Sequence, residues 1–368
     1  MKADYVMIGG FLGAGKTTAV LALGAHLAAH GKRVGLITND QSVGLVDTAL
    51  AAAHGFAVEE ITGGCFCCRF TSLTEAAERL QARSRPDVFI AEPVGSCTDL
   101  RASVSYPLRR LYGDAYRVAP LSVLVDPVRA LRMFGLEPGR SFSARVKYVY
   151  DKQLEEADLI VINKIDLVDE ARLEALARAL ASQYPQAEVI AVSARHRRGL
   201  DQWFARIFET ELRLVQSPDV DYDIYADGEA RLGWFNATIA VTSDPAGDGN
   251  ALLGDFATAI QRHLAAADIE IAHCKMTLSA TELNGDLAAL NVVRTDGVPE
   301  LAHRLADPLT TGELLLNLRA ESMPDRLQTA VQRALDDVQQ GASWRLIVRH
   351  AEAFSPPRPT PTHRMATA

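Results

Sequence analysis

The chain has 368 residues, more than a single hydrophobic core usually fills, so we expect one large domain and a smaller one. Its 48% hydrophobic and 23% charged residues are typical of a globular protein and exclude disorder over most of the length. A formal net charge of -8 argues against nucleic acid as the main partner, because phosphate contacts require a basic face.

The length of the apolar runs and the clustering of the cysteines indicate the cellular compartment of the protein. No run reaches the roughly 18 apolar residues of a membrane span, and the chain enters the apolar segment Tyr5–Ile8 without a charged leader. We therefore expect a cytoplasmic protein with no membrane segment. The five cysteines are clustered rather than scattered, which in a reducing cytosol favours metal binding or redox chemistry over a disulfide framework.

Short apolar runs rich in valine and isoleucine alternate with longer amphipathic segments from residue 4 to about residue 208. Near-continuous apolar strands separated by helices are typical of a parallel sheet covered on both faces. We predict an α/β domain over residues 1–212, with a doubly wound, mostly parallel sheet. The predicted strands are 5–8, 33–38, 58–61, 88–92, 121–126, 159–163 and 189–193.

The sequence then becomes acidic and aperiodic, and we predict a linker over residues 213–230. Runs of strands with two interspersed helices, Leu252–Ala266 and Pro324–Gln339, indicate a smaller α+β domain over residues 231–354. The segment 355–368 contains four prolines and no apolar periodicity, so we predict a disordered tail.

The segment GFLGAGKTT satisfies the phosphate-loop pattern, after a predicted strand and at the start of a predicted helix. In such a loop the backbone amides face phosphates, the lysine neutralises the β and γ oxygens, and the hydroxyl residue ligates magnesium. A glycine-rich turn without a ligand is the ordinary alternative, but this context favours a P-loop NTPase. The predicted nucleotide contacts are Gly10, Gly13, Ala14, Gly15, Lys16, Thr17 and Thr18, with Lys16 also catalytic and Thr17 also a magnesium ligand.

A second motif, Asn163-Lys164-Ile165-Asp166, lies at the end of a predicted strand, where a doubly wound sheet places its ligand contacts. The Asp166 carboxylate can accept hydrogen bonds from N1 and the exocyclic amine of guanine, a donor pair that adenine lacks. Its position after a phosphate loop therefore favours GTP over an ordinary strand end. Ser193-Ala194, at the end of the next strand, would supply a backbone amide to the guanine oxygen.

Two acidic residues follow other strands at the same edge of the predicted sheet. Asp40 comes after the second strand, and Glu92 begins the tetrapeptide Glu92-Pro93-Val94-Gly95 after the fourth. We predict that Asp40 and Glu92 contact the magnesium shell or orient the attacking water, and that the Gly95 amide senses the γ-phosphate. The simpler alternative is a solvated Asp40 and a Glu92 that caps a helix.

Three of the five cysteines, Cys65, Cys67 and Cys68, fall within four positions. Thiolates are soft ligands that select zinc, cobalt or copper(I)-type ions, whereas a lone buried cysteine behaves as a small hydrophobe. We predict a transition-metal site with one coordination position left for water, a carboxylate or another protein chain. Redox sensing and a structural zinc remain as alternatives, and Cys97 and Cys274 are expected to be packing residues.

These motifs, in this order and spacing, resemble the CobW-like GTPases, whose relatives include the nickel chaperones UreG and HypB. The resemblance covers about the first 210 residues and rests most specifically on the run Gly64-Cys65-Phe66-Cys67-Cys68. It implies that GTP binding and hydrolysis control the acquisition and transfer of zinc, cobalt or another transition metal. It further implies Cys65, Cys67 and Cys68 as metal ligands.

We therefore predict a GTPase metallochaperone that uses GTP, Mg²⁺ and Zn²⁺ or Co²⁺. Its expected partner is a client metalloenzyme or a cofactor-assembly protein, and a homodimer is left open. One alternative is a G-protein gate for loading an organic cofactor, with structural or redox cysteines. Another is a P-loop small-molecule kinase, which the Asn163-Lys164-Ile165-Asp166 motif disfavours.

Overall fold

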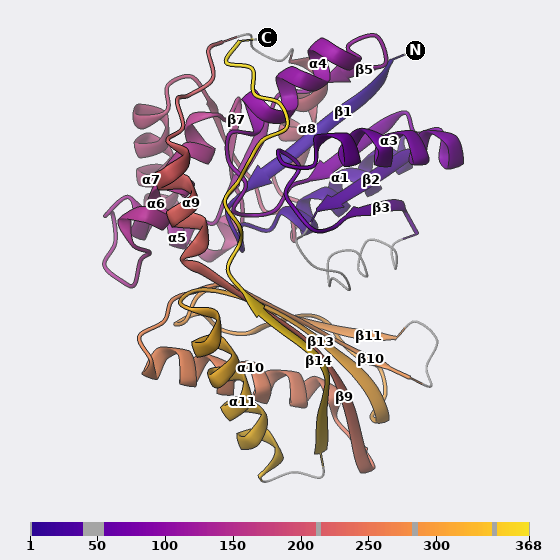
Figure 1. The fold of residues 1–368 in the computed structure, drawn as a ribbon, viewed down its shortest axis with the longest axis vertical. Helices are drawn as coiled ribbons and strands as arrows, with labels where there is room; N and C mark the ends of the chain where they lie inside the picture. The colour runs from indigo at the N-terminus through magenta and orange to yellow at the C-terminus, as the bar shows by residue number, and fades with distance from the viewer. Residues whose placement is uncertain (1, 40–54, 211–214, 282–285, 341–343, 368) are drawn as a thin grey trace. The chain divides into compact units, whose positions relative to one another are not determined.

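The computed structural model describes residues 2–39, 55–210, 215–281, 286–340 and 344–367 (Figure 1). The chain forms two compact units. Unit 1 takes most of the chain up to residue 228 together with residues 358–368, and unit 2 takes residues 229–357. The C-terminal segment therefore returns to the unit in which the chain begins.

Unit 1 is built on an eight-stranded sheet with the order β3-β2-β4-β1-β6-β7-β8, and β5 pairs with β1 beside this path. All its described pairings are parallel. The strands are apolar and mostly buried, as expected when helices cover both faces. Their bounds are Ala3–Gly10 (β1), Val34–Asn39 (β2), Ala57–Ile61 (β3), Val88–Glu92 (β4), Tyr116–Val118 (β5), Ser122–Val125 (β6), Leu159–Ile162 (β7) and Glu188–Ala191 (β8).

The helices of unit 1 connect these strands. Helices α1 and α8 share a hydrophobic core with the sheet, in which Leu23 and Trp203 are fully buried. The helix bounds are Lys16–Ala29 (α1), Phe70–Ser84 (α3), Tyr106–Tyr112 (α4), Pro127–Met133 (α5), Ala144–Glu155 (α6), Glu170–Gln183 (α7), Leu200–Glu209 (α8) and Tyr222–Ala230 (α9), with short helical turns at Arg101–Ser105 (η1) and Ile165–Leu167 (η2). The predicted P-loop-type α/β fold with a mostly parallel sheet is confirmed.

Unit 2 is an antiparallel six-stranded sheet with the order β12-β11-β10-β13-β9-β14. Its apolar face packs against two helices, α10 and α11, around residues such as Phe256, Leu316 and Val331. This is the separate α+β layer that the sequence predicts. The bounds are Leu232–Gly247 (β9), Gly249–Ala266 (α10), Ile271–Ala280 (β10), Leu287–Val292 (β11), Glu300–His303 (β12), Leu309–Glu321 (β13), Pro324–Gln339 (α11) and Trp344–Phe354 (β14).

Two segments differ from the sequence-based expectations. The acidic segment expected to be an aperiodic linker contains α9, whose Tyr225 hydroxyl accepts a hydrogen bond from the Thr98 amide at 3.2 Å. The proline-rich tail contains no helix or strand over residues 358–367, yet it packs against unit 1 rather than being disordered. Amino-acid composition does not predict the structure of these two segments, because tertiary hydrogen bonds hold both of them.

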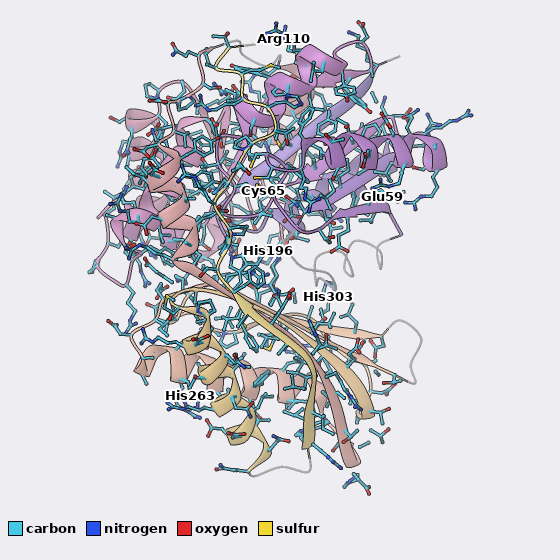
Figure 2. All side chains as sticks on the ribbon, viewed as in Figure 1. Glu59, Cys65, Arg110, His196, His263 and His303 are labelled. Carbon is cyan, nitrogen blue, oxygen red and sulfur yellow. The ribbon has the colours of Figure 1, made fainter. Side chains whose placement is uncertain are left out.

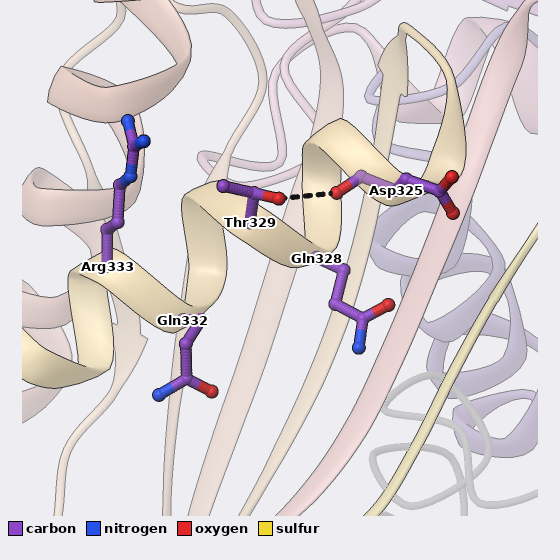
Figure 3. Close-up of a pocket in the computed structure, with 5 residues that line it drawn as sticks. All are labelled: Asp325, Gln328, Thr329, Gln332 and Arg333. Atoms are coloured by element: carbon purple, nitrogen blue, oxygen red, sulfur yellow. Dashed lines mark hydrogen bonds between the residues drawn. The ribbon is translucent and has the colours of Figure 1, made fainter.

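Among the described helices, none has the length and apolarity to cross a membrane. A surface pocket lies along α11 of unit 2, lined by Asp325, Gln328, Thr329, Gln332 and Arg333 (Figure 3). In it the Thr329 hydroxyl donates a hydrogen bond to the backbone oxygen of Asp325 at 2.8 Å, and the other side chains point in different directions. This pocket contains none of the predicted site residues.

Candidate nucleotide and metal site

The phosphate loop connects β1 to α1, and its backbone geometry requires glycine. Gly10 has φ 130° and Gly15 has φ 90°. A Cβ at Gly10 would lie 2.4 Å from the Leu124 oxygen, and one at Gly15 would lie 2.5 Å from Asn163 Nδ2. Lys16 Nζ donates a hydrogen bond to the Gly10 oxygen at 3.0 Å, so the lysine folds back over the loop. Phosphate oxygens are bound by the backbone amides of such a turned loop and by the ammonium group of a lysine folded over it.

The second motif lies directly against this loop. Asn163 Nδ2 donates to the Ala14 oxygen at 3.0 Å, and Lys164 Nζ donates to the Gly13 oxygen at 2.6 Å. Lys164 Nζ also forms an ion pair at 3.0 Å with Asp126, the residue that caps the N-terminus of α5. The structure therefore brings together two motifs separated by about 150 positions in the sequence.

Asp166 lies beside the end of β8. The Ser193 hydroxyl donates to Asp166 Oδ1 at 2.5 Å, and His196 Nε2 lies 3.7 Å from Asp166 Oδ2. The Ala194 amide donates to Asn163 Oδ1 at 3.0 Å. Ser193 thus fixes the orientation of the carboxylate proposed to read guanine. His196 is a neighbour that no sequence pattern indicated.

Glu92 and Thr17 meet at the carboxyl end of the sheet. Glu92 ends β4 and is 6% exposed, and its Oε1 accepts a hydrogen bond from Thr17 Oγ1 at 3.0 Å. A hydroxyl can donate its proton to a carboxylate while its oxygen faces a magnesium ion, so this contact is compatible with both predicted roles. Thr18 is exposed in the first turn of α1. Asp40 lies outside the described residues.

The loop after β4 packs tightly on the phosphate loop. A Cβ at Gly95 would lie 2.7 Å from the Leu12 side chain and 3.0 Å from its amide nitrogen. Gln153 of α6, 2% exposed, holds this loop by donating from Nε2 to the oxygens of Gly95 at 2.9 Å and Cys97 at 2.8 Å. Nothing in the sequence indicates this role of Gln153, since a single glutamine on an amphipathic helix belongs to no functional motif.

Asn39, the last residue of β2, fastens the cysteine-containing loop. Its Nδ2 donates to the oxygens of Ile61 at 3.0 Å and Gly64 at 2.7 Å, and its Oδ1 accepts from the Phe66 amide at 3.0 Å. No motif of the sequence indicated Asn39, which directly precedes Asp40. Its side chain joins the end of β2 to the loop that contains the three clustered cysteines.

The three clustered thiols converge just before α3. The sulfur separations are 2.7 Å for Cys65–Cys67, 3.2 Å for Cys65–Cys68 and 3.7 Å for Cys67–Cys68. Tetrahedral zinc, with bonds of about 2.3 Å, places its sulfur ligands roughly 3.8 Å apart. Small movements of the three cysteine side chains would therefore let them bind a thiophilic ion. Cys65 and Cys67 are buried and Cys68 is half-buried. Hydrogen bonding with the side chains of Cys67 and Cys68 holds the pKa of the Cys65 thiol well below its ordinary value.

Cys97 is a buried residue of the loop after β4, and its expected role as a packing residue stays a prediction. Its side chain lowers the pKa of the Cys65 thiol and raises that of the Cys67 thiol, after the larger effects of Cys65, Cys67 and Cys68 on one another. Cys97 is 1% exposed and lies five positions after Glu92, on a different strand connection. Cys274, in contrast, packs in the core of unit 2, where burial raises the pKa of its thiol to about 12.

The C-terminal segment, residues 358–367, runs along the same loop, and we call it the C-terminal strap. Thr360 donates its amide to Cys68 Sγ at 3.2 Å. Thr362 donates its amide to the Cys67 oxygen and its hydroxyl to the Cys68 oxygen, both at 3.0 Å. Figure 2 labels Cys65 beside this segment. The strap therefore binds the cysteine loop through backbone groups, and amino-acid composition gives no indication of such contacts.

Fold and site together define a P-loop nucleotide-binding protein with a thiol cluster beside its nucleotide loops. The chain belongs to the CobW/HypB/UreG family, because the model of that family's nucleotide-binding domain matches residues 4–191. The resemblance inferred from the motifs is confirmed at this level.

Named relatives agree with this assignment. The zinc chaperone CobW of Sinorhizobium sp is 30% identical over 203 residues, covering 50% of this chain and 56% of that protein. The zinc chaperone YeiR of Escherichia coli (strain K12) is 39% identical over 90 residues, covering 24% of this chain and 27% of that protein. The chain thus spans about half the length of the first relative and about a quarter of the second.

Similarity to solved structures is more distant. HypB from Helicobacter pylori in complex with nickel shares 19% identity and a TM-score of 0.42, covering 56% of this chain and 86% of that one. Structural similarity at this identity and TM-score does not support a conclusion about function.

Proposed function

We propose that this protein is a cytoplasmic GTPase that binds a transition metal through Cys65, Cys67 and Cys68 and delivers it to a client protein. One observation supports it above all others. Asn39 at the end of β2 hydrogen-bonds the loop in which the three sulfurs lie within 4.8 Å of one another. A soft-ligand cluster is thereby attached to the strand that leads into the nucleotide site.

GTP and Mg²⁺ would be held by the residues already placed together around the phosphate loop. Lys16 would bind the β and γ phosphates and Thr17 the magnesium ion, while Asp166, oriented by Ser193, would read guanine. The remaining contacts would come from Gly10, Gly13, Ala14, Gly15, Thr18, Gly95, Asn163, Lys164 and Ala194. The magnesium would neutralise the developing negative charge on the phosphates.

Hydrolysis would depend on Glu92 and Asp40. Glu92 is buried and accepts a hydrogen bond from Thr17, which supports a role for its carboxylate in orienting the attacking water or a magnesium-bound water. Asp40 is proposed for the same shell from its place in the sequence. Loss of the γ-phosphate would then release the loop around Gly95.

The metal, zinc or cobalt, is cargo and passes to the client. As the ion binds, the three thiols lose their protons to solvent and become thiolate ligands, so the ion itself stabilises the deprotonated cluster. Nucleotide control requires that the GTP and GDP states differ in metal affinity, because a ligand shifts an equilibrium only by its differential affinity. We propose that the GTP state binds the ion more tightly and that hydrolysis or client docking weakens it.

The test is a zinc and cobalt titration of the full chain with magnesium and a GTP analogue, and then with GDP. We expect about 5- to 150-fold tighter binding in the GTP-analogue state, the usual range of coupling between sites. Thiolate-to-metal absorption of the cobalt form reports ligation directly. Equal affinities in the two states would rule the switch out.

A matched set of variants separates the alternatives. Replacing Cys65, Cys67 and Cys68 by serine should abolish thiolate-to-metal absorption, whereas Cys274→Ser, a buried thiol of unit 2, should leave it intact. Client activation that survives the triple replacement would support the organic-cofactor gate instead. A phosphorylated small-molecule product, with ATP competing well against GTP, would identify a kinase.

A further inference from the structure

The C-terminal strap lies against Cys68, the half-buried and most accessible thiol of the cluster. The Thr360 amide donates to Cys68 Sγ at 3.2 Å. The Thr362 amide donates to the Cys67 oxygen and the Thr362 hydroxyl to the Cys68 oxygen, both at 3.0 Å. The strap thus contacts both the sulfur of Cys68 and the backbone that positions it.

An ion pair anchors the strap beyond the cysteine loop. Arg364 Nε donates to Asp99 Oδ2 at 2.8 Å. Asp99 is 2% exposed, and its Oδ2 also accepts a hydrogen bond from the Tyr222 hydroxyl at 2.6 Å. The Met365 amide adds a hydrogen bond to the Ala102 oxygen at 2.9 Å. Because a charge-assisted bond is stronger than a neutral one, we expect Arg364 to be the main anchor.

The strap can detach without unfolding the sheet of unit 1. Its described residues form no helix or strand, and Thr360, Thr362 and Arg364 are exposed. Segments that bury few apolar side chains and keep solvent-exposed hydrogen bonds open locally, at a cost far below that of global unfolding. Pro359 and Pro361 restrict the backbone on either side of Thr360, so a detached strap loses less conformational entropy when it binds again.

We propose that the strap is a removable cover of the cysteine loop, and that its detachment limits access to the Cys68 thiol. One part of this inference rests on the proposed function: the metal ion enters and leaves the cluster through the detached state, and a client gains access by displacing the strap. When the ion leaves, the thiolates take up protons from solvent, so no oxidation state changes. Because access scales with the detached population, weakening an anchor of the strap raises the rate of exchange.

The first measurement requires no metal. Cys68 of the metal-free, full-length protein is alkylated with iodoacetamide, and its modification is followed by mass spectrometry. We expect Arg364→Ala to accelerate this modification about fivefold, because a bond to a charged group is worth about tenfold or more and the partial exposure of Arg364 lowers that factor. Deletion of residues 358–368 removes all the contacts of the strap and should accelerate it by at least about tenfold. A synthetic peptide of those residues, added in excess, should slow the reaction again.

Two controls separate detachment of the strap from other changes. Arg178→Ala removes an exposed ion pair with Glu174 on α7, and it should leave the modification of Cys68 unchanged. Cys274, buried in unit 2, is an internal reference whose modification should stay slow in every variant. Melting temperatures check that each variant is folded.

The second measurement follows zinc loss from the zinc-loaded, full-length protein to an excess of chelator. Arg364→Ala and the deletion should accelerate zinc loss by the same factors as alkylation, because both rates depend on one detachment equilibrium. The added peptide should again slow the loss, and Arg178→Ala should match the unaltered protein.

Each result decides a different claim. Modification of Cys68 that is unchanged by the deletion, or that the peptide does not slow in the folded truncated protein, would overturn the cover. Zinc loss that stays constant while Cys68 modification accelerates would overturn its control of metal exchange. If the unaltered protein binds no zinc or cobalt, the proposed function fails, and the rates of Cys68 modification still decide whether the strap covers the thiol.

Discussion

Asp166→Asn should convert the protein from a GTP binder to a xanthosine triphosphate binder, with GTP affinity falling by roughly 100-fold or more. Asp166 is proposed to accept two hydrogen bonds from guanine, and each bond to a charged acceptor is worth about 1.5–3 kcal/mol. Asparagine presents an NH₂ group to one of those donors, whereas xanthine carries an oxygen at that position and restores the match. Ser193, 2.5 Å from Asp166 Oδ1, can still donate to the asparagine oxygen.

Affinities of both proteins for fluorescent GTP and xanthosine triphosphate analogues provide the measurement. Asp169→Asn is the matched control, because it makes the same change three positions later, where the carboxylate only caps α7 by accepting from the Arg172 amide at 2.9 Å. Asparagine is an equally good N-cap, so the control should bind GTP normally. GTP affinity unchanged in Asp166→Asn would show that the base is read elsewhere.

Glu92→Gln should slow GTP hydrolysis by about 100-fold or more while leaving GTP affinity within about threefold. Positioned carboxylates that take a proton or orient water contribute typically 10²- to 10⁴-fold, and an amide cannot replace that function. The amide oxygen can still accept the Thr17 hydroxyl, which now donates to Glu92 at 3.0 Å, so the binding geometry should persist.

Single-turnover phosphate release and equilibrium binding measured on the same protein separate the two effects. Glu59→Gln is the control: Glu59 lies on β3 of the same sheet but pairs with Arg79 at 2.7 Å. A normal hydrolysis rate in Glu92→Gln would assign the water-orienting role to another residue. A slow but GTP-loaded variant would also show whether metal transfer precedes hydrolysis, because it would hold the protein in one state.

Much of the fold follows from local patterns in the sequence. Strand β4 and helix α11 lie at the predicted residues, because near-continuous apolar runs and a proline at the helix start are strong local signals. The short strands β5 and β12 were missed. With three and four residues respectively, they are too short to show a period, and β12 is largely exposed.

The site was predictable only in part, for a different reason. Glycines at positive φ and residues at strand ends carry their own signals, so the phosphate loop and Asp166 could be found. The contact of the C-terminal strap with the cysteine loop could not, since Thr360 meets Cys68 across 292 positions of the sequence, a pairing that no local pattern specifies. Asn39 and Gln153 act through side-chain bonds to backbone oxygens, which any exposed amide could make elsewhere.

The C-terminal strap has a consequence for the synthesis of the protein. Thr360 lies 292 residues after the Cys68 thiol that it contacts. At 5–20 residues per second, a ribosome needs roughly 15–60 s to make that stretch. Throughout this interval the cysteine loop lacks the hydrogen bonds of the strap, so Cys68 is less covered than in the finished protein. Under the proposed function, the thiols are therefore open to a first metal ion during translation, before the strap forms its hydrogen bonds with the cysteine loop.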